Sequence, residues 1–295
     1  MKKTRIFEGV GTALITPLLG GNIDYECLGR LIEMQISGGV DCIVIGGTTG
    51  EAATLTAAER YRLFAFARER TDRRCRLVFG TGTNDTKVAI DHTKKAYEIG
   101  CDGVLLVTPY YNKGTEEGVY KHYESIAKCA DLPIILYNVP SRTGVNLGLG
   151  LLERLAKIDT VAGIKEASDS ADRLVSLAAF GDELPLYAGN DSQIYTALAL
   201  GGAGVISVAS NIFPEMIKRI TADYFGGDVG KSLDMQLSLL PFIRTLFIET
   251  NPAPIKHAMK CLGLCSGEVR LPLDVPREST MAAVEYELKR LSQVG

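Results

Sequence analysis

Short apolar segments recur along the chain, and each is followed by a longer stretch with apolar residues at helical spacing. The segments lack the alternation of apolar and polar residues that marks a strand with one solvent-exposed face, so we expect strands that are covered on both faces. The eight segments are residues 10–16, 42–46, 77–82, 103–109, 133–139, 161–167, 184–189 and 204–209. Eight successive strand–helix units predict an α/β fold of the (β/α)8 barrel type.

After the eighth segment the pattern becomes purely helical. The pattern predicts three helices. The first carries the apolar stripe described next, the second begins after Asn251 with Pro252 in its first turn, and the third covers residues 280–291. The first of these helices has one apolar stripe, which we expect to pack against the barrel, formed by Leu233, Leu237, Leu240, Ile243 and Phe247. We therefore predict a catalytic barrel domain over residues 1–226 and a C-terminal three-helix extension over residues 227–295.

The composition is that of an ordinary globular protein. The 295 residues include 32 Lys and Arg against 35 Asp and Glu, for a net charge of −3, so neither disorder nor a basic nucleic-acid-binding face is expected. The N-terminal apolar run resembles a signal peptide, but Thr12, Thr16 and Pro17 interrupt it, which favours a buried first strand. No apolar run reaches the roughly 18 residues of a membrane helix, and we expect a cytoplasmic protein with no membrane partner.

Cysteine and histidine usage argues against a metal. The seven cysteines are odd in number and form no Cys-x-x-Cys pair, which indicates reduced thiols. Cys261 and Cys265 are four residues apart on a predicted helix, a spacing that can hold a metal, but no histidine pair or second cysteine pair completes the site. His92, His122 and His257 are far apart in the sequence, and we expect them on the surface or in the core.

Catalytic residues of such a barrel stand at the carboxyl ends of its strands. There the sixth segment places Lys165, in surroundings otherwise suited to burial. Burial favours a neutral amine, which can attack a ketone carbonyl and form a Schiff base. A lysine that reaches the rim, or pairs with Glu166, is an equal alternative from position alone.

Hydroxyl groups at neighbouring strand ends favour the Schiff base. Proton transfer at the carbinolamine and enamine stages needs an acid–base group, and Tyr137 follows the adjacent strand, with Thr48 and Tyr111 able to extend a relay. A lone tyrosine in an apolar run is more often part of the core. Arg142 has the planar fork that suits a substrate carboxylate, although a surface ion pair is the commoner role of a loop arginine.

Several motifs resemble, in order and spacing, those of the dihydrodipicolinate synthase family: GTTGE, TPYYN, YNVPSRTG, GIKEASD, AGND and ETNPAPIKHAM. The resemblance covers nearly the whole chain. It implies a Schiff-base-forming lyase, related to N-acetylneuraminate lyase, that condenses pyruvate with L-aspartate 4-semialdehyde in the diaminopimelate route to lysine. It implies no cofactor, since pyruvate forms a covalent imine on Lys165.

The resemblance also implies roles for single residues. Tyr137, Thr48 and Tyr111 match a proton relay, and in relatives the tyrosine matching Tyr111 crosses a tight dimer interface, which implies a homo-oligomer, either a dimer or a tetramer built from two dimers. Of the remaining matches, Thr49 and the backbone near Ile206 bind the pyruvate carboxylate, Gly189 lies in a substrate loop, and Arg142 receives the carboxylate of the semialdehyde.

Feedback inhibition by lysine is expected to be weak or absent. Remnants of the regulatory site are Asn84 and Tyr110, but the serine, histidines and glutamate of inhibited relatives are replaced here by Ala52, Ala57, Arg60 and Val88. An apolar group in place of the acid leaves a lysine ammonium without a partner. Two other functions stay open: a sugar-acid lyase of the same superfamily, which lacks the Ser-Arg-Thr-Gly sequence of residues 141–144, and a non-catalytic binding protein on the same barrel.

Overall fold

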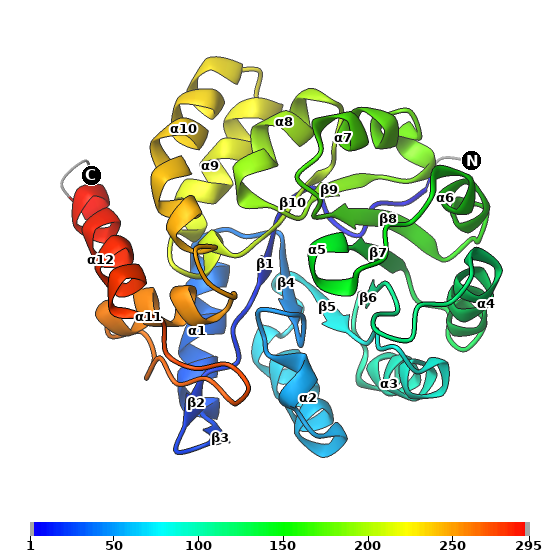
Figure 1. The fold of residues 1–295 in the computed structure, drawn as a ribbon, viewed down its shortest axis with the longest axis horizontal. Helices are drawn as coiled ribbons and strands as arrows, with labels where there is room; N and C mark the ends of the chain where they lie inside the picture. Colours follow the sequence, from blue (N-terminus) through cyan, green and yellow to red (C-terminus); the bar gives the residue numbers. More distant parts are fainter. Residues whose placement is uncertain (1–2, 293–295) are drawn as a thin grey trace.

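The computed structural model describes residues 3–292 and contains a closed barrel of eight parallel strands (Figure 1). Each strand pairs with the next in sequence, and the last pairs with the first. The strands are β1 (Gly9–Ala13), β4 (Cys42–Ile45), β5 (Arg76–Gly80), β6 (Gly103–Val107), β7 (Ile134–Asn138), β8 (Val161–Glu166), β9 (Leu186–Ala188) and β10 (Gly204–Ser207). The predicted barrel is confirmed, and each strand ends slightly before its predicted segment, because the last residues of each segment already belong to a loop.

The strands are buried on both sides, as the apolar segments predict. Val44 and Val78 point into the barrel interior, whereas Ile43 and Leu77 pack outward against the helices. The outer helices are α1 (Tyr25–Ser37), α2 (Ala57–Thr71), α3 (Thr86–Ile99), α4 (Glu116–Ala127), α6 (Leu149–Ala156), α7 (Ala171–Ala178), α8 (Ile194–Ala199) and α9 (Pro214–Phe225). Several begin at a side chain that accepts a backbone N–H of the first turn; at α2, Thr56 and Glu59 form a capping box.

Two small elements were not predicted. A hairpin of β2 (Leu18–Leu19) and β3 (Asn22–Ile23) follows the first strand, and the one-turn helix α5 (Pro140–Thr143) follows β7. Helix α5 begins with proline at its first position and ends at Gly144, which has a φ of 65° in the left-handed region. This turn sets the position of Arg142.

The C-terminal extension consists of α10 (Val229–Thr245), α11 (Ala253–Cys261) and α12 (Glu278–Ser292); α10 packs against α9, and α12 packs against α10 and α11 (Figure 1). The helices agree with the prediction, but the predicted apolar stripe is only partly buried: Ile243 is buried as expected, whereas Leu233 and Leu237 of α10, and Phe247 just beyond its end, are exposed. The buried face includes Ser232 and Gln236, whose side chains donate to the backbone carbonyls of Ile220 and Asp191 at 2.7 and 3.1 Å. Polar side chains with hydrogen-bond partners thus occupy part of the buried face of α10, where the pattern predicted apolar side chains. The division into two domains stays a prediction.

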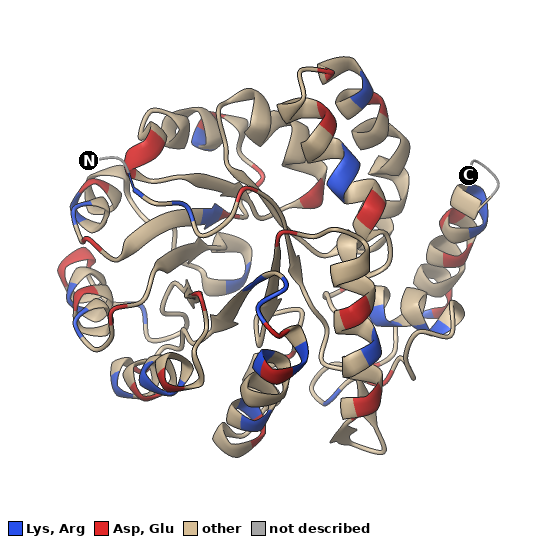
Figure 2. Cartoon of the chain, turned by 180° about the vertical axis from the view of Figure 1, so that it is seen from behind, with Lys and Arg blue, Asp and Glu red and all other residues tan. Residues whose placement is uncertain are grey.

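Charged residues of both signs are intermixed along the outer helices, whereas the barrel strands are largely uncharged (Figure 2). Among the described residues, no helix is both long and apolar enough to cross a membrane. The cytoplasmic location stays a prediction.

Candidate active site

Lys165 of β8 and Tyr137 of β7 lie side by side at the carboxyl ends of adjacent strands, where the sheet register pairs them directly. Their exposed fractions are 5% and 6%, and the Lys165 Nζ lies 4.5 Å from the centre of the Tyr137 ring. The face of an aromatic ring attracts a cation, so this contact helps to position the Lys165 side chain beside Tyr137.

Glu166 does not pair with Lys165, contrary to the alternative that the sequence left open. Successive residues of a strand point to opposite faces, and the Glu166 carboxylate instead accepts from the side-chain amide of Asn138 at 2.9 and 3.0 Å and from the N–H of Ser168 at 2.9 Å. It also forms an ion pair with Arg173. Within residues 3–292, the Lys165 amine therefore forms no direct ion pair with a carboxylate; the buried acid Asp191 interacts with it only electrostatically, and the Lys165 charge lowers the pKa of Asp191 against the larger effect of burial.

Lys165 lines a cavity of about 390 Å³, the Lys165 cavity. Its walls include the predicted site residues Thr48, Thr49, Tyr137, Arg142 and Gly189. A Cβ at Gly189 would lie 2.6 Å from the Glu166 carbonyl oxygen, so only glycine fits this close approach of two strand ends. Ile206 is fully buried in β10 and is not among the residues that line the cavity.

Asn251, which sequence reasoning missed as a site residue, joins two predicted ones. It precedes α11 and is 4% exposed. Its side-chain amide donates to the Thr49 hydroxyl at 2.9 Å, and its backbone carbonyl accepts from Arg142 Nη2 at 3.1 Å. Among the described residues Arg142 forms no ion pair, so the surface-pair alternative fails and the guanidinium remains available to a carboxylate. The signal for Asn251 was its place in the ETNPAPIKHAM motif.

Tyr111 does not reach the Lys165 cavity of its own chain. Its side chain is 90% exposed, and its φ of 69° lies in the left-handed region, which non-glycine residues seldom adopt. The expected convergence of three hydroxyls is therefore wrong for a single chain, where only Thr48 and Tyr137 meet at the cavity. The strained turn displays the phenol on the surface.

A second cavity of about 320 Å³, the Arg60 cavity, adjoins the first and shares Thr48, Tyr137 and Arg142 with it. Tyr110 lines it, whereas Asn84 contributes only a carbonyl to Asn112 at 3.0 Å. The buried Arg60 guanidinium donates to two backbone carbonyls, and burial lowers its pKa. No acid among the described residues pairs with Arg60, so its guanidinium adds positive charge to this cavity.

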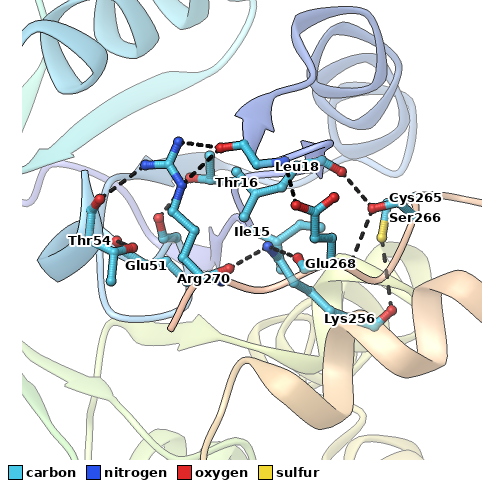
Figure 3. A network of polar contacts seen from close by, with 12 residues as sticks. Ile15, Thr16, Leu18, Glu51, Thr54, Lys256, Cys265, Ser266, Glu268 and Arg270 are labelled. Carbon is cyan, nitrogen blue, oxygen red and sulfur yellow. Dashed lines mark hydrogen bonds and ion pairs between the residues drawn. The ribbon is translucent and has the colours of Figure 1, made fainter. Parts of the chain in front are cut away.

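Glu51, the last residue of the GTTGE motif, lines the Arg60 cavity and is held by a polar network (Figure 3). Its carboxylate forms an ion pair with Lys256 of α11 and accepts the backbone N–H of Arg270 at 2.9 Å. Lys256 Nζ also donates to the Glu268 carbonyl at 2.8 Å. The network attaches the loop that bears Thr48 and Thr49 to the C-terminal extension. Glu51 itself has a left-handed φ of 53°, which this network holds in place.

Comparison with known proteins agrees with these features. A model described as the dihydrodipicolinate synthetase family matches residues 6–291. A 4-hydroxy-tetrahydrodipicolinate synthase of Brachyspira hyodysenteriae is 46% identical over 91% of this chain and 92% of its own. The solved structure of a 4-hydroxy-tetrahydrodipicolinate synthase from Methylacidiphilum fumariolicum superposes with a TM-score of 0.95 at 40% identity, covering 97% of this chain and 96% of the other. A monomeric dihydrodipicolinate synthase variant superposes equally well, with a TM-score of 0.95 at 39% identity and 97% of each chain.

Proposed function

Because the chain belongs to the dihydrodipicolinate synthetase family, we propose that it condenses pyruvate with L-aspartate 4-semialdehyde to give 4-hydroxy-tetrahydrodipicolinate. One observation carries the proposal: the Lys165 amine is buried at a cavity, lies against Tyr137 and forms no direct ion pair among the described residues. A lysine in that state suits imine formation with a ketone.

The first half of the reaction takes place at Lys165. Its nitrogen adds to the C2 carbonyl of pyruvate, and the carbinolamine then loses water to form an imine. The hydroxyls of Tyr137 and Thr48, which line the same cavity, are placed to move protons at these steps. The imine withdraws electrons from the methyl carbon, which loses a proton to give an enamine, so the reaction requires no further cofactor.

The second half joins the two substrates. The enamine carbon attacks the aldehyde carbon of the semialdehyde and forms the new carbon–carbon bond. Arg142, tethered by the Asn251 carbonyl, receives the carboxylate of this substrate and orients it. The amino group of the second substrate then displaces Lys165 from the imine carbon, which closes the ring and restores the free lysine. Overall, one pyruvate and one L-aspartate 4-semialdehyde give one 4-hydroxy-tetrahydrodipicolinate and one water.

We further propose that the active enzyme is a homo-oligomer in which Tyr111 completes the site of the partner subunit. The Tyr111 side chain is 90% exposed on a turn with a left-handed φ, and it does not line the Lys165 cavity of its own chain. A two-fold dimer contact places each subunit's residue at the other's site, so a single interface supplies both sites.

We propose weak or absent inhibition by lysine. The position that holds an acid in inhibited relatives is Val88, 38% exposed, and Arg60 adds a buried cation to the adjoining cavity. An ammonium group entering this cavity would meet like charge and no carboxylate except Glu51, which Lys256 already neutralises.

Borohydride trapping tests the assignment of Lys165. Reduction in the presence of pyruvate converts the imine to a stable secondary amine, and peptide mass mapping locates it. We expect the label on Lys165, and no label in Lys165→Ala. Active enzyme that is labelled on another lysine, or not at all, would refute the mechanism. A turnover assay that offers aspartate semialdehyde, N-acetylneuraminate and 2-keto-3-deoxy sugar acids then separates the proposed activity from the sugar-acid lyase alternative.

A further inference from the structure

Three side chains with metal-binding atoms meet between α11 and α12, outside both cavities. His257 and Cys261 lie four residues apart on α11, and Glu285 reaches them from α12. The Cys261 Sγ is 3.4 Å from His257 Nε2 and 4.0 Å from Glu285 Oε1, and His257 Nε2 is 3.1 Å from the same Glu285 oxygen.

These separations match one face of a tetrahedral zinc site. Zinc bonds of about 2.3 Å to sulfur and about 2.0–2.1 Å to nitrogen and oxygen, at tetrahedral angles, place two ligand atoms roughly 3.3–3.6 Å apart. The sulfur–nitrogen distance of 3.4 Å lies within that range, and the other two distances depart from it by a few tenths of an ångström. Small side-chain rotations of Cys261 and Glu285, which are both solvent-accessible, would close the difference.

We propose that His257, Cys261 and Glu285 bind a divalent d-block cation such as Zn²⁺ through one imidazole nitrogen, one thiolate and one carboxylate oxygen. This ligand set suits borderline-soft cations rather than Mg²⁺ or Ca²⁺, which prefer oxygen ligands alone. The site is half-exposed, so water can occupy the fourth position. Nothing in the reaction at Lys165 involves this metal.

The sequence analysis considered Cys265 as the second metal ligand beside Cys261 on the same helix, but the structure does not place the two on one helix. Cys265 lies beyond the end of α11, and its Sγ faces the Lys256 carbonyl at 3.9 Å. The true neighbours are His257, one turn earlier, and Glu285, which is distant in sequence. Because a cysteine binds a metal as its thiolate, binding at Cys261 would release a proton.

Metal binding would link α12 to α11, the helix whose Lys256 pairs with Glu51. Lys256 pairs with Glu51 inside the protein, while the adjacent His257 faces α12. A metal at His257, Cys261 and Glu285 therefore fastens α12 to a helix already fixed at its other face. Because the metal binds only the folded arrangement, it raises the unfolding temperature as its concentration increases.

Titration of the full chain with Co²⁺ tests the site, because a cobalt–thiolate bond gives a charge-transfer band in the near ultraviolet. We expect one Co²⁺ per chain, displaced by Zn²⁺, with the band lost in Cys261→Ser and retained in the matched control Cys265→Ser. His257→Gln and Glu285→Gln should each weaken binding by at least about tenfold. Zn²⁺ should raise the melting temperature of the parent chain and of Cys265→Ser, but not of Cys261→Ser.

Two results would overturn the proposal. A charge-transfer band that persists in Cys261→Ser would assign binding to another thiol. No band and no saturable binding in the parent chain would leave His257 and Glu285 as a simple ion pair. Each variant is checked for native circular dichroism and for pyruvate-dependent labelling of Lys165, so that loss of metal binding is not confused with unfolding or with a failure of the proposed reaction.

Discussion

Glu51 in the loop after β4 and Lys256 in α11 form an ion pair whose side chains are only 2% and 1% exposed. Removing one partner of a buried pair leaves an uncompensated charge and costs about 3–5 kcal/mol. We expect Lys256→Met and Glu51→Gln each to lower the free energy of unfolding by roughly that amount, as measured by urea denaturation. The double variant should lose much less than the sum of the two. Additive losses would show that the two side chains do not depend on each other.

Arg142→Ala should damage the second half of the reaction and spare the first. Loss of a charge-assisted contact of about 1.5–3 kcal/mol corresponds to a fall in kcat/KM for the semialdehyde of about ten- to a hundredfold. Labelling of Lys165 by pyruvate and borohydride should continue at the parent rate. Arg142→Lys, which keeps the charge but not the planar fork, should have a kcat/KM for the semialdehyde between those of the parent enzyme and Arg142→Ala. Semialdehyde kinetics that do not change in Arg142→Ala would give the arginine a structural role.

Subunit mixing tests the shared site proposed for Tyr111. Lys165→Ala and Tyr111→Phe are each expected to be nearly inactive alone. If the tyrosine crosses the interface, a mixed dimer has one site with both defects and one site with neither, so activity should return as subunits exchange. Mass spectrometry verifies the exchange. Mixed dimers that form without any gain in activity would place Tyr111 outside the partner's site.

Lysine should not inhibit the enzyme at low millimolar concentration. Titration of lysine into a coupled assay measures this directly. Half-inhibition below about 1 mM, which corresponds to binding stronger than roughly −4 kcal/mol, would show that other residues supply the missing partner for the ammonium. In that event Arg60→His and Val88→Glu, which restore residue types of inhibited relatives, should change the inhibition little.

Two buried histidines should make the fold sensitive to mild acid. Burial lowers the pKa of His122 to about 4, and burial together with the Arg60 guanidinium lowers that of His92 to about 4. In the unfolded chain both groups take up protons near pH 6.5, so between pH 7 and pH 5 the unfolded state gains protons that the folded state does not.

The free energy of unfolding should accordingly fall by up to about 2 kcal/mol per histidine over that interval. Urea denaturation at several pH values measures the slope. His122→Asn removes one titrating group, so it should reduce the slope even if it destabilises the fold at pH 7. A slope that is the same in this variant would mean that His122 titrates alike in both states.

The barrel was predictable because its strands are unusually uniform: runs such as residues 42–46 are apolar at every position, which only a strand buried on both faces requires. Lys165 attracted notice for the opposite reason, since a charged group ends such a run; its position alone left a reactive amine and a rim or ion-paired lysine equally open, and its catalytic role stays a prediction. The face of α10 was not predictable, because the apolar stripe through Leu233 competes with a face where Gln236 is satisfied by backbone groups distant in sequence.

Other site features depend on distant parts of the chain meeting. Asn251 is a polar residue in a loop, and its importance comes from Thr49 and Arg142, which only the fold brings within reach. His257, Cys261 and Glu285 likewise become a cluster only when α12 packs on α11. Spacing rules detect ligands on one helix, but they do not detect a ligand supplied by the next helix.

The position of Asn251 has a consequence for protein synthesis. Lys165 and Tyr137 leave the ribosome well before Asn251 and Lys256, because translation proceeds from the N-terminus. A nascent chain that has completed all eight strands still lacks the amide that holds Thr49, the carbonyl that holds Arg142 and the ammonium that neutralises Glu51. The lysine proposed to form the imine is therefore made early, whereas the arrangement proposed to select the second substrate is finished only when translation reaches the last helices.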